Sequence, residues 1–272
     1  GVELTGKNEG LTIFKGIPYA APPVGELRWR PPQDPEPWNE VRLFNTYGKI
    51  EIQHYSQRKD QPLKKDQMSE DCLYLNITTP AKTAGEKLPV FVWLHGGGLT
   101  NGAAYGDNGD AYEPYSFARR GNVVVSIGHR INIWGFMALP QLSKEQGGKS
   151  GNYGVMDLVK AMDWIWENIE KFGGDRNNIS AGGCSGGTQK TCLMASIPAG
   201  KNRIRHITNS SGLKWRQVPF PTMKEAEEQG RQYLKYTGID PDTPLEKLRA
   251  MDSWEIHGKA PREYYPGDII YD

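Results

Sequence analysis

The feature that narrows the possible folds of this chain furthest is the pentapeptide at residues 183–187, Gly-Cys-Ser-Gly-Gly, which has the pattern G-x-S-x-G. It follows a strand-like segment and precedes a helix-like one. Small residues on both sides of a serine permit a turn so tight that the hydroxyl is exposed at the top of a sheet. The pattern therefore predicts a strand, a sharp bend and a helix, with Ser185 presented as a nucleophile.

A second glycine-rich segment lies about ninety residues earlier in the chain. His95-Gly96-Gly97-Gly98 directly follows the apolar run at 90–94. Backbone N–H groups of such a loop can bind the oxyanion that forms during acyl transfer. Either motif alone is a weak signal, but the two in this order predict ester hydrolysis by a serine nucleophile.

The composition excludes several other classes of protein. The 33 Lys and Arg residues nearly balance 32 Asp and Glu residues, and no basic cluster alternates with aromatic residues, so nucleic acid is not an expected partner. The apolar runs are of strand length, below the roughly 18 residues of a membrane span, so no membrane association is expected. The first residues lack a signal-peptide pattern, which leaves open a cytoplasmic location or secretion after signal removal.

The three cysteines, Cys72, Cys184 and Cys192, are too few and odd in number for a disulfide framework. Neither Cys-x-x-Cys nor His-x-x-x-His occurs, so a structural zinc site is not expected. The cysteines are interpreted as buried free thiols, and the predicted chemistry requires neither a metal nor an organic cofactor.

Hydrophobic patterns predict a sheet. The first eighty residues are rich in turns, with short strands at 12–14 and 73–77. The nearly continuous apolar runs at 88–94 and 122–127 are typical of buried strands in a parallel sheet that is covered on both faces.

Further elements follow in the second half of the chain. A helix is predicted over 155–169, because apolar residues recur at steps of three and four. Strands at 178–182 and 204–208 and a helix at 187–196 surround the serine motif. Charged amphipathic helices at 224–236 and 245–256 predict a cap-like segment over 220–265. The chain ends on a strand-like apolar segment, from which we expect that the remainder of the protein is absent, through truncation or cleavage.

Several longer motifs resemble those of type B carboxylesterases, the cholinesterase-like branch of the α/β-hydrolases. They lie at 14–20, 22–25, 27–29, 69–76, 134–136, 151–154 with Asp157, and 172–175. The resemblance extends to at least Gly212. It implies an α/β-hydrolase fold with a mostly parallel central sheet, helices on both faces and an incomplete C-terminus. Residues 1–272 would then form the N-terminal portion of a single domain, with antiparallel entry strands in 1–80.

The resemblance also implies roles for individual residues. Ser185 would be the nucleophile, and the backbone N–H groups of Gly97, Gly98 and Gly186 would be the oxyanion donors. Gly96 would shape the loop that carries two of these donors.

Two further residues are expected to support this machinery. His95 would hold the glycines of the loop in place. Ser211 matches a family serine that sits behind the acid of the catalytic triad, and its implied role is hydrogen bonding around the site.

The sequence departs from the family pattern in three ways. The family usually has Glu before the nucleophile and Ala after it, where this chain has Cys184 and Gly186. The usual partner of Cys72 would stand near Glu51, so that disulfide cannot form. The family's triad acid and histidine lie beyond residue 272.

A complete triad is therefore not expected within this chain. The triad order is serine, acid, histidine, yet His54, His95 and His129 precede the serine. The two later histidines, His206 and His257, are interpreted as structural, like the other three. Because a serine without a general base is a poor nucleophile at neutral pH, we expect this chain alone to be nearly inactive. The missing C-terminal half, in one polypeptide or as a separate chain, would supply the triad for a small-molecule ester substrate.

Two alternatives accompany this prediction. Cholinesterase-like domains also serve as binding or adhesion modules, generally with the nucleophile lost, whereas Ser185 is retained here. A phosphate-binding loop of the type G-x-G-x-x-G is disfavoured, since Asn101 stands where the third glycine belongs. Among the aromatic residues, Trp93 is interpreted as a core residue, and Trp215 is left open between core and substrate pocket.

Overall fold

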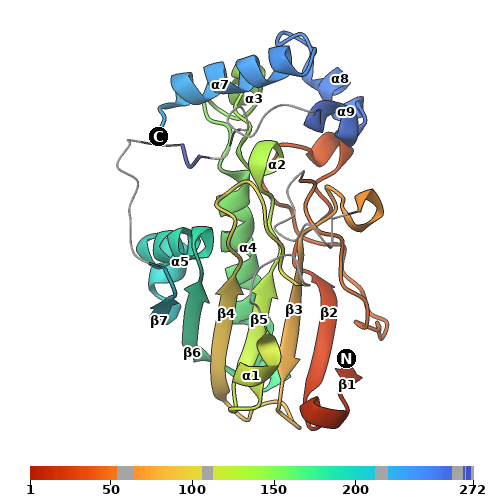
Figure 1. The fold of residues 1–272 in the computed structure, drawn as a ribbon, viewed down its shortest axis with the longest axis vertical. Helices are drawn as coiled ribbons and strands as arrows, with labels where there is room; N and C mark the ends of the chain where they lie inside the picture. The colour runs from red at the N-terminus through yellow and green to blue at the C-terminus, as the bar shows by residue number, and fades with distance from the viewer. Residues whose placement is uncertain (54–63, 106–112, 212–219, 259–265, 267, 271–272) are drawn as a thin grey trace.

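Seven strands form one mixed sheet in the part of the chain that the structure describes, residues 1–53, 64–105, 113–211, 220–258, 266 and 268–270. In this computed structural model the order across the sheet is β1-β2-β3-β5-β4-β6-β7 (Figure 1). The strands are β1 Val2–Glu3, β2 Thr12–Pro18, β3 Tyr74–Thr79, β4 Leu88–Leu94, β5 Val123–Ile127, β6 Gly174–Gly183 and β7 Ile204–Asn209.

The sheet has an antiparallel part and a parallel part. Strand β2 pairs antiparallel with β1 on one side and with β3 on the other, and β3 also pairs antiparallel with β5. Strands β5, β4, β6 and β7 are parallel. This arrangement confirms the predicted α/β class with a mostly parallel central sheet.

Nine α-helices accompany the sheet within the described ranges. They are α1 Pro114–Ala118, α2 Asn132–Phe136, α3 Pro140–Glu145, α4 Tyr153–Asn168, α5 Gly186–Ser196, α6 Pro198–Lys201, α7 Met223–Tyr236, α8 Leu245–Ala250 and α9 Ser253–His257. None of the helices in these ranges has both the length and the apolar character needed to cross a membrane.

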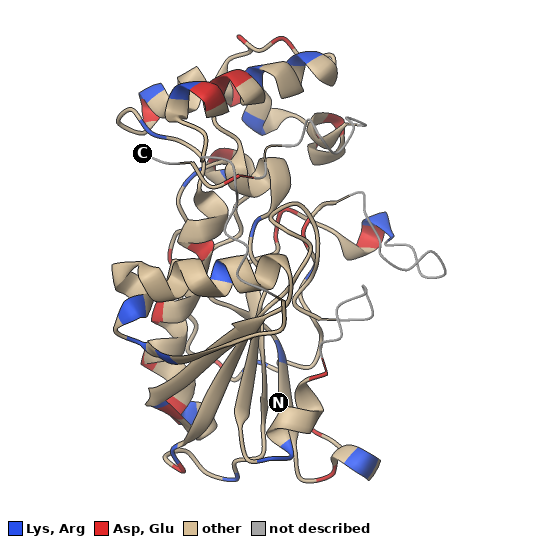
Figure 2. Ribbon diagram, turned by 60° about the vertical axis from the view of Figure 1, so that its left-hand side comes forward, with Lys and Arg blue, Asp and Glu red and all other residues tan. Residues whose placement is uncertain are grey.

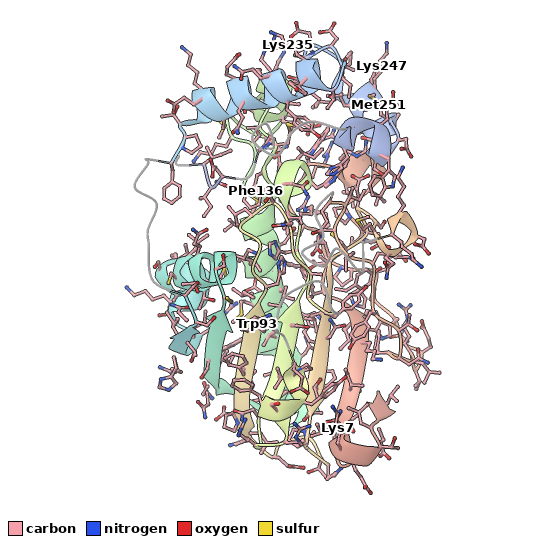
Figure 3. The ribbon with its side chains drawn as sticks, viewed as in Figure 1. Lys7, Trp93, Phe136, Lys235, Lys247 and Met251 are labelled. Atoms are coloured by element: carbon pink, nitrogen blue, oxygen red, sulfur yellow. The ribbon has the colours of Figure 1, made fainter. Side chains whose placement is uncertain are left out.

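The side chains of the central strand β4 point alternately to the two faces of the sheet, so the core has two layers. Val90, Val92 and Leu94 pack on the face that α4 and α5 cover, in one cluster with apolar residues of both helices. Phe91 lies on the opposite face, with Ala118 of α1. Trp93 also packs against this second cluster and is half-buried (Figure 3). Because successive side chains of a strand point to opposite faces, one run of apolar residues can supply both layers.

The helices α7, α8 and α9 lie at the end of the molecule beyond the carboxyl ends of the parallel strands (Figure 1). Charges of both signs are interspersed along α7 (Figure 2). The buried faces of these helices belong to another core cluster, separate from the two on either side of β4, through Tyr233, Leu248 and Ile256. A buried ion pair between Arg28 and Glu70 lies beside them, since Arg28 also donates to the carbonyl of Leu248.

One predicted helix is two helices in the structure. The segment 245–256 is interrupted between α8 and α9, where the carboxylate of Asp252 accepts hydrogen bonds from the backbone N–H groups of Trp254 and Glu255. An aspartate in this position caps a new helix N-terminus. The prediction of one continuous helix was therefore wrong.

Strand register brings the two predicted functional loops together. Leu94, the last residue of β4, pairs with Gly183, the last residue of the neighbouring parallel strand β6. The segments that follow, His95 and Cys184 onwards, therefore leave the sheet side by side.

Candidate active site

Ser185 occupies a strained bend between β6 and α5. Its backbone has φ 54° and ψ −118°, a combination that residues with a side chain rarely adopt and that costs about 1–3 kcal/mol. The residue is exposed. A methyl group on Gly183 would come within 2.6 Å of the Leu94 carbonyl oxygen, and one on Gly187 would overlap the same atom. Glycine is therefore required on both sides of the bend.

The backbone of Ser185 is held from two sides. Its carbonyl accepts a hydrogen bond of 3.0 Å from Thr188 N in the first turn of α5. Its N–H donates to the Oγ of Ser211, at 2.6 Å. The bend thus sits at the N-terminus of an eleven-residue helix, where the helix dipole favours negative charge.

The glycine segment after β4 turns back on itself. Gly97 and Gly98 have φ values of 83° and 63°, in the left-handed region that favours glycine. The carbonyl of Gly97 accepts from Asn101 N at 3.2 Å, and a side chain on Gly97 would strike the backbone of Asn101. Gly96 is buried, whereas Gly97 and Gly98 are half-buried.

The two loops meet at the bend. A methyl group on Gly186 would lie 2.6 Å from the Gly98 carbonyl oxygen and still closer to the Gly98 N and Cα atoms. The structure therefore brings the backbone of Gly98 into contact with the residue that follows Ser185. Gly98, Ser185 and Gly186, which the sequence analysis predicted as site residues on two loops far apart along the chain, are therefore neighbours.

His95 is fully buried beneath the glycine segment. Its Nδ1 lies 2.8 Å from the Gly96 carbonyl oxygen, and its ring stacks on that of His129 with 4.8 Å between ring centroids. Burial, together with the positive charge of Lys190, lowers the pKa of both imidazoles well below the ordinary value. Both rings are therefore neutral at neutral pH and serve as packing and hydrogen-bonding groups.

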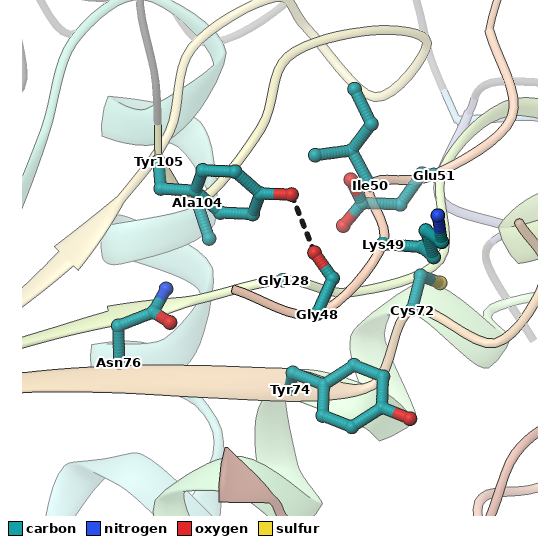
Figure 4. Close-up of a pocket in the computed structure, with 10 residues that line it drawn as sticks. All are labelled: Gly48, Lys49, Ile50, Glu51, Cys72, Tyr74, Asn76, Ala104, Tyr105 and Gly128. Atoms are coloured by element: carbon teal, nitrogen blue, oxygen red, sulfur yellow. Dashed lines mark hydrogen bonds between the residues drawn. The ribbon is translucent and has the colours of Figure 1, made fainter. Parts of the chain in front are cut away.

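Glu51 and Cys72 line the same small cavity of about 10 Å³, roughly the space of one water molecule (Figure 4). Burial raises the pKa of Glu51 to about 8. Burial also raises the pKa of the Cys72 thiol, and the nearby Glu51 adds to the effect. The side chain of Glu51 is oriented by a hydrogen bond of 2.7 Å from His129 N. All three cysteines are free, but only Cys72 is buried, so the expectation of buried thiols was wrong for the half-buried Cys184 and Cys192.

The other histidines lie in different surroundings. His257 is buried, and its ring stacks 6.3 Å from that of Trp134. His206 is exposed on β7, and His54 lies outside the described residues, as does Trp215. Within the described ranges, no group of three or more His, Cys, Asp or Glu residues is placed to hold a metal ion.

Three buried polar residues of this site were not predicted from the sequence. Lys190 of α5 donates to the His95 carbonyl oxygen at 3.0 Å. Gln53 ties down the far end of the glycine segment, since its amide donates to Gly102 O at 2.7 Å and accepts from Gly102 N at 2.8 Å. Glu51 was considered only as the residue near a missing disulfide partner. Polar side chains in a loop or a short helix are normally solvated, so nothing in the local pattern indicated their burial.

The curated proteins most similar in the comparison include several named as esterases. The fumonisin B1 esterase of Sphingopyxis macrogoltabida is 39% identical over 248 residues, which cover 90% of this chain and 43% of that protein. Carboxylesterase 1E of Mus musculus is 38% identical over 225 residues, covering 78% of this chain and 38% of that protein. The chain thus spans less than half the length of these curated relatives.

Solved structures agree with the fold. The carboxylesterase EST55 of Geobacillus stearothermophilus superposes with a TM-score of 0.78 at 34% identity, over 91% of this chain and 50% of that one. The EstA protein of Aspergillus niger superposes with a TM-score of 0.75 at 30% identity, over 94% and 47%. A model of the carboxylesterase family matches residues 1–262. The chain, an α/β-hydrolase in fold, therefore belongs to the carboxylesterase family.

Proposed function

We propose that the protein hydrolyses carboxylic esters through an acyl-enzyme on Ser185. The observation that supports this most directly is the contact between Gly98 and Gly186 beside an exposed serine in a strained bend. In this mechanism the Ser185 oxygen attacks the ester carbonyl carbon, and the alcohol leaves with a proton as the acyl-enzyme forms. Water then attacks the acyl group, and the carboxylic acid is released as the serine recovers its proton.

Backbone donors would stabilise the charge that develops in both steps. The N–H groups of Gly97, Gly98 and Gly186 are proposed to bind the oxyanion, with the N-terminus of α5 adding its dipole. His95 would keep the glycine segment in place from below, and Ser211 would fix the backbone of Ser185. Such preorganised donors need no reorientation when the charge appears.

The base and the acid of the triad are proposed to come from polypeptide outside residues 1–272. Of the four described histidines, His95, His129 and His257 are buried, and His206 lies exposed on the outer strand β7. Strand β7 has no second neighbour among the described strands, and its residues 205–208 are exposed. In this proposal the chain is the N-terminal portion of one domain, and 220–265 is its cap-like segment.

A serine-directed fluorophosphonate tests the nucleophile. The protein encoded by the complete reading frame should carry one adduct, on Ser185, and the variant Ser185→Ala should carry none at that position. Absence of an adduct in the unchanged protein would instead favour a binding or adhesion module, which the sequence alone left open.

Turnover of p-nitrophenyl acetate tests whether catalysis needs residues outside 1–272. Residues 1–272 alone should show only the small residual rate that oxyanion donors and binding provide, whereas the complete protein should turn over many times. Equal activity of the two would refute the need for outside residues. Fumonisin B1 belongs in the substrate panel because one relative is named for its hydrolysis.

A further inference from the structure

Lys190 is a buried lysine in a position where a solvated one would be expected. Its side chain belongs to α5, the helix that begins directly after Ser185, and it is 2% exposed. Lysine is almost never fully buried unless its ammonium group is paired. Here Nζ lies 3.0 Å from the carbonyl oxygen of His95 and 3.4 Å from its Nδ1 atom.

The carbonyl of His95 is the acceptor that Lys190 uses. Nδ1 of His95 lies 2.8 Å from the Gly96 carbonyl oxygen, which can only accept a hydrogen bond. Nδ1 therefore bears the ring proton and cannot also accept from the ammonium group. Lys190 thus binds the backbone of His95 directly, one residue before the glycine segment begins.

The contact extends an interface between α5 and the glycine segment. Gly186 touches Gly98, and a methyl group on Gly187 would lie 3.1 Å from the His95 carbonyl oxygen. Residues three and four positions apart share one face of a helix. Lys190 follows Gly187 by three positions and Gly186 by four, so all three face the loop. The two glycines allow close approach, and the lysine supplies a charged hydrogen bond across the same surface.

The positive charge of Lys190 acts on three buried neighbours, His95, His129 and Glu51. The pKa of His95 and that of His129 are lowered by burial, and the positive charge of Lys190 contributes to the effect. The same charge opposes the burial that raises the pKa of Glu51. A hydrogen bond with an ionised donor is roughly twice as strong as one between neutral groups.

We propose that Lys190 is a positioning residue for ester hydrolysis, which holds the oxyanion loop against the nucleophile helix by binding the His95 carbonyl. This inference rests on the proposed function of Ser185. It assigns to α5 a second role besides presenting the serine, because the same helix fixes the distance between Ser185 and the donors of Gly97 and Gly98.

The variant Lys190→Met tests the proposal, since methionine has a similar length but cannot donate a hydrogen bond. The kcat for an ester should fall about 10- to 100-fold with KM nearly unchanged, because loss of an oxyanion donor costs up to about a thousandfold. The kcat for the matched thionoester should fall much less, because its sulfur is a weak acceptor that gains little from the backbone donors. Lys201→Met, on the exposed end of α6, is the control and should behave like the unchanged protein.

Deuterium exchange of residues 95–101 in the complete protein separates this proposal from the proposed function. Exchange should increase in Lys190→Met while exchange of β5 stays constant, whether or not the protein hydrolyses the chosen ester. If Lys190→Met does not fold, Lys190→Gln is measured instead and should show the same increase in smaller degree. Unchanged exchange in a folded variant, or equal losses for ester and thionoester, would overturn the assignment.

Discussion

The Oγ atom of Ser211 accepts a hydrogen bond from the backbone N–H of Ser185 at a distance of 2.6 Å. The two residues are 26 positions apart, and each lies two residues beyond the end of a strand, Ser185 after β6 and Ser211 after the neighbouring parallel strand β7. The bond fixes the backbone at the strained bend, and Ser211 also lies 3.4 Å from Thr188 Oγ1 in the first turn of α5. The resemblance implied a place for Ser211 behind the acid of the triad, and that role stays a prediction.

Replacing Ser211 by alanine should therefore weaken catalysis without affecting substrate binding. An unpaired N–H costs about 1 kcal/mol or more, so we expect kcat to fall about 3- to 10-fold and KM to change little. Steady-state kinetics of the complete protein with p-nitrophenyl acetate measures both. Ser196→Ala is the control, because that hydroxyl donates to the Cys192 carbonyl at the far end of α5. An unchanged kcat in Ser211→Ala would contradict the role.

Gly186→Ala should be more damaging, although the esterases that this chain resembles usually have alanine at that position. A methyl group at Gly186 would overlap Gly98, so the glycine segment would have to move away from the bend. Displacing oxyanion donors should lower kcat about 10- to 100-fold. The exposed Gln189 of the same helix offers the control Gln189→Ala. Full activity of Gly186→Ala would show that the loop adjusts without cost.

The buried ion pair between Arg130 and Asp157 should dominate the stability of the helix layer. Asp157 accepts from Arg130 N, Nε and Nη2 at 2.9, 2.9 and 2.7 Å, and both side chains are almost fully buried. Asp157→Asn leaves the guanidinium group without a counter-charge, which typically costs about 3–5 kcal/mol.

A second ion pair of α4 provides the comparison. Lys160 lies one turn further along the helix and pairs with Asp34, which is largely exposed. Lys160→Met should cost less than about 1 kcal/mol, as exposed pairs usually do. Urea unfolding of both variants measures the difference, and similar losses would show that burial does not distinguish the pairs.

Much of the sheet could be predicted from local patterns. The apolar run 88–94 and the amphipathic helix around 155–169 agree with β4 and with α4, because burial on one or both faces imposes a period that the sequence displays. The glycine motifs were equally informative. Glycine is required there by close backbone approach, which lies within one loop for Gly97 and Asn101 and joins the two loops for Gly186 and Gly98.

Long-range contacts could not be predicted in the same way. The insertion of β4 between β5 and β6 depends on pairing between distant segments. The burial of Lys190 depends on a loop about ninety residues earlier in the chain that covers its side of α5. A single charged residue in a short helix gives no local sign of such a cover, so the most informative contact of the site became visible only in three dimensions.

The raised pKa of Glu51 predicts that the free energy of unfolding depends on pH, and the sign of this dependence follows from the direction of the shift. The ordinary value is 4.5, and burial raises the pKa to about 8 in the folded chain. Between these two values the unfolded chain has lost the proton and the folded chain retains it. The folded state therefore binds more protons, and its stability falls as the pH rises from about 4.5 to about 8.

Glu51→Gln removes this dependence while keeping an oxygen for the His129 N–H group. Between pH 5 and pH 8 the variant should gain about 3 kcal/mol relative to the unchanged protein, at about 1.4 kcal/mol per pH unit over most of that range. The lowered pKa values of His95 and His129 act in the opposite direction below pH 6.5, but they are common to both proteins and cancel in the difference. Urea unfolding at pH 5, 6.5 and 8 measures this difference, with the exposed Glu9→Gln as the control. A difference that stays constant with pH would mean that Glu51 is already ionised in the folded chain.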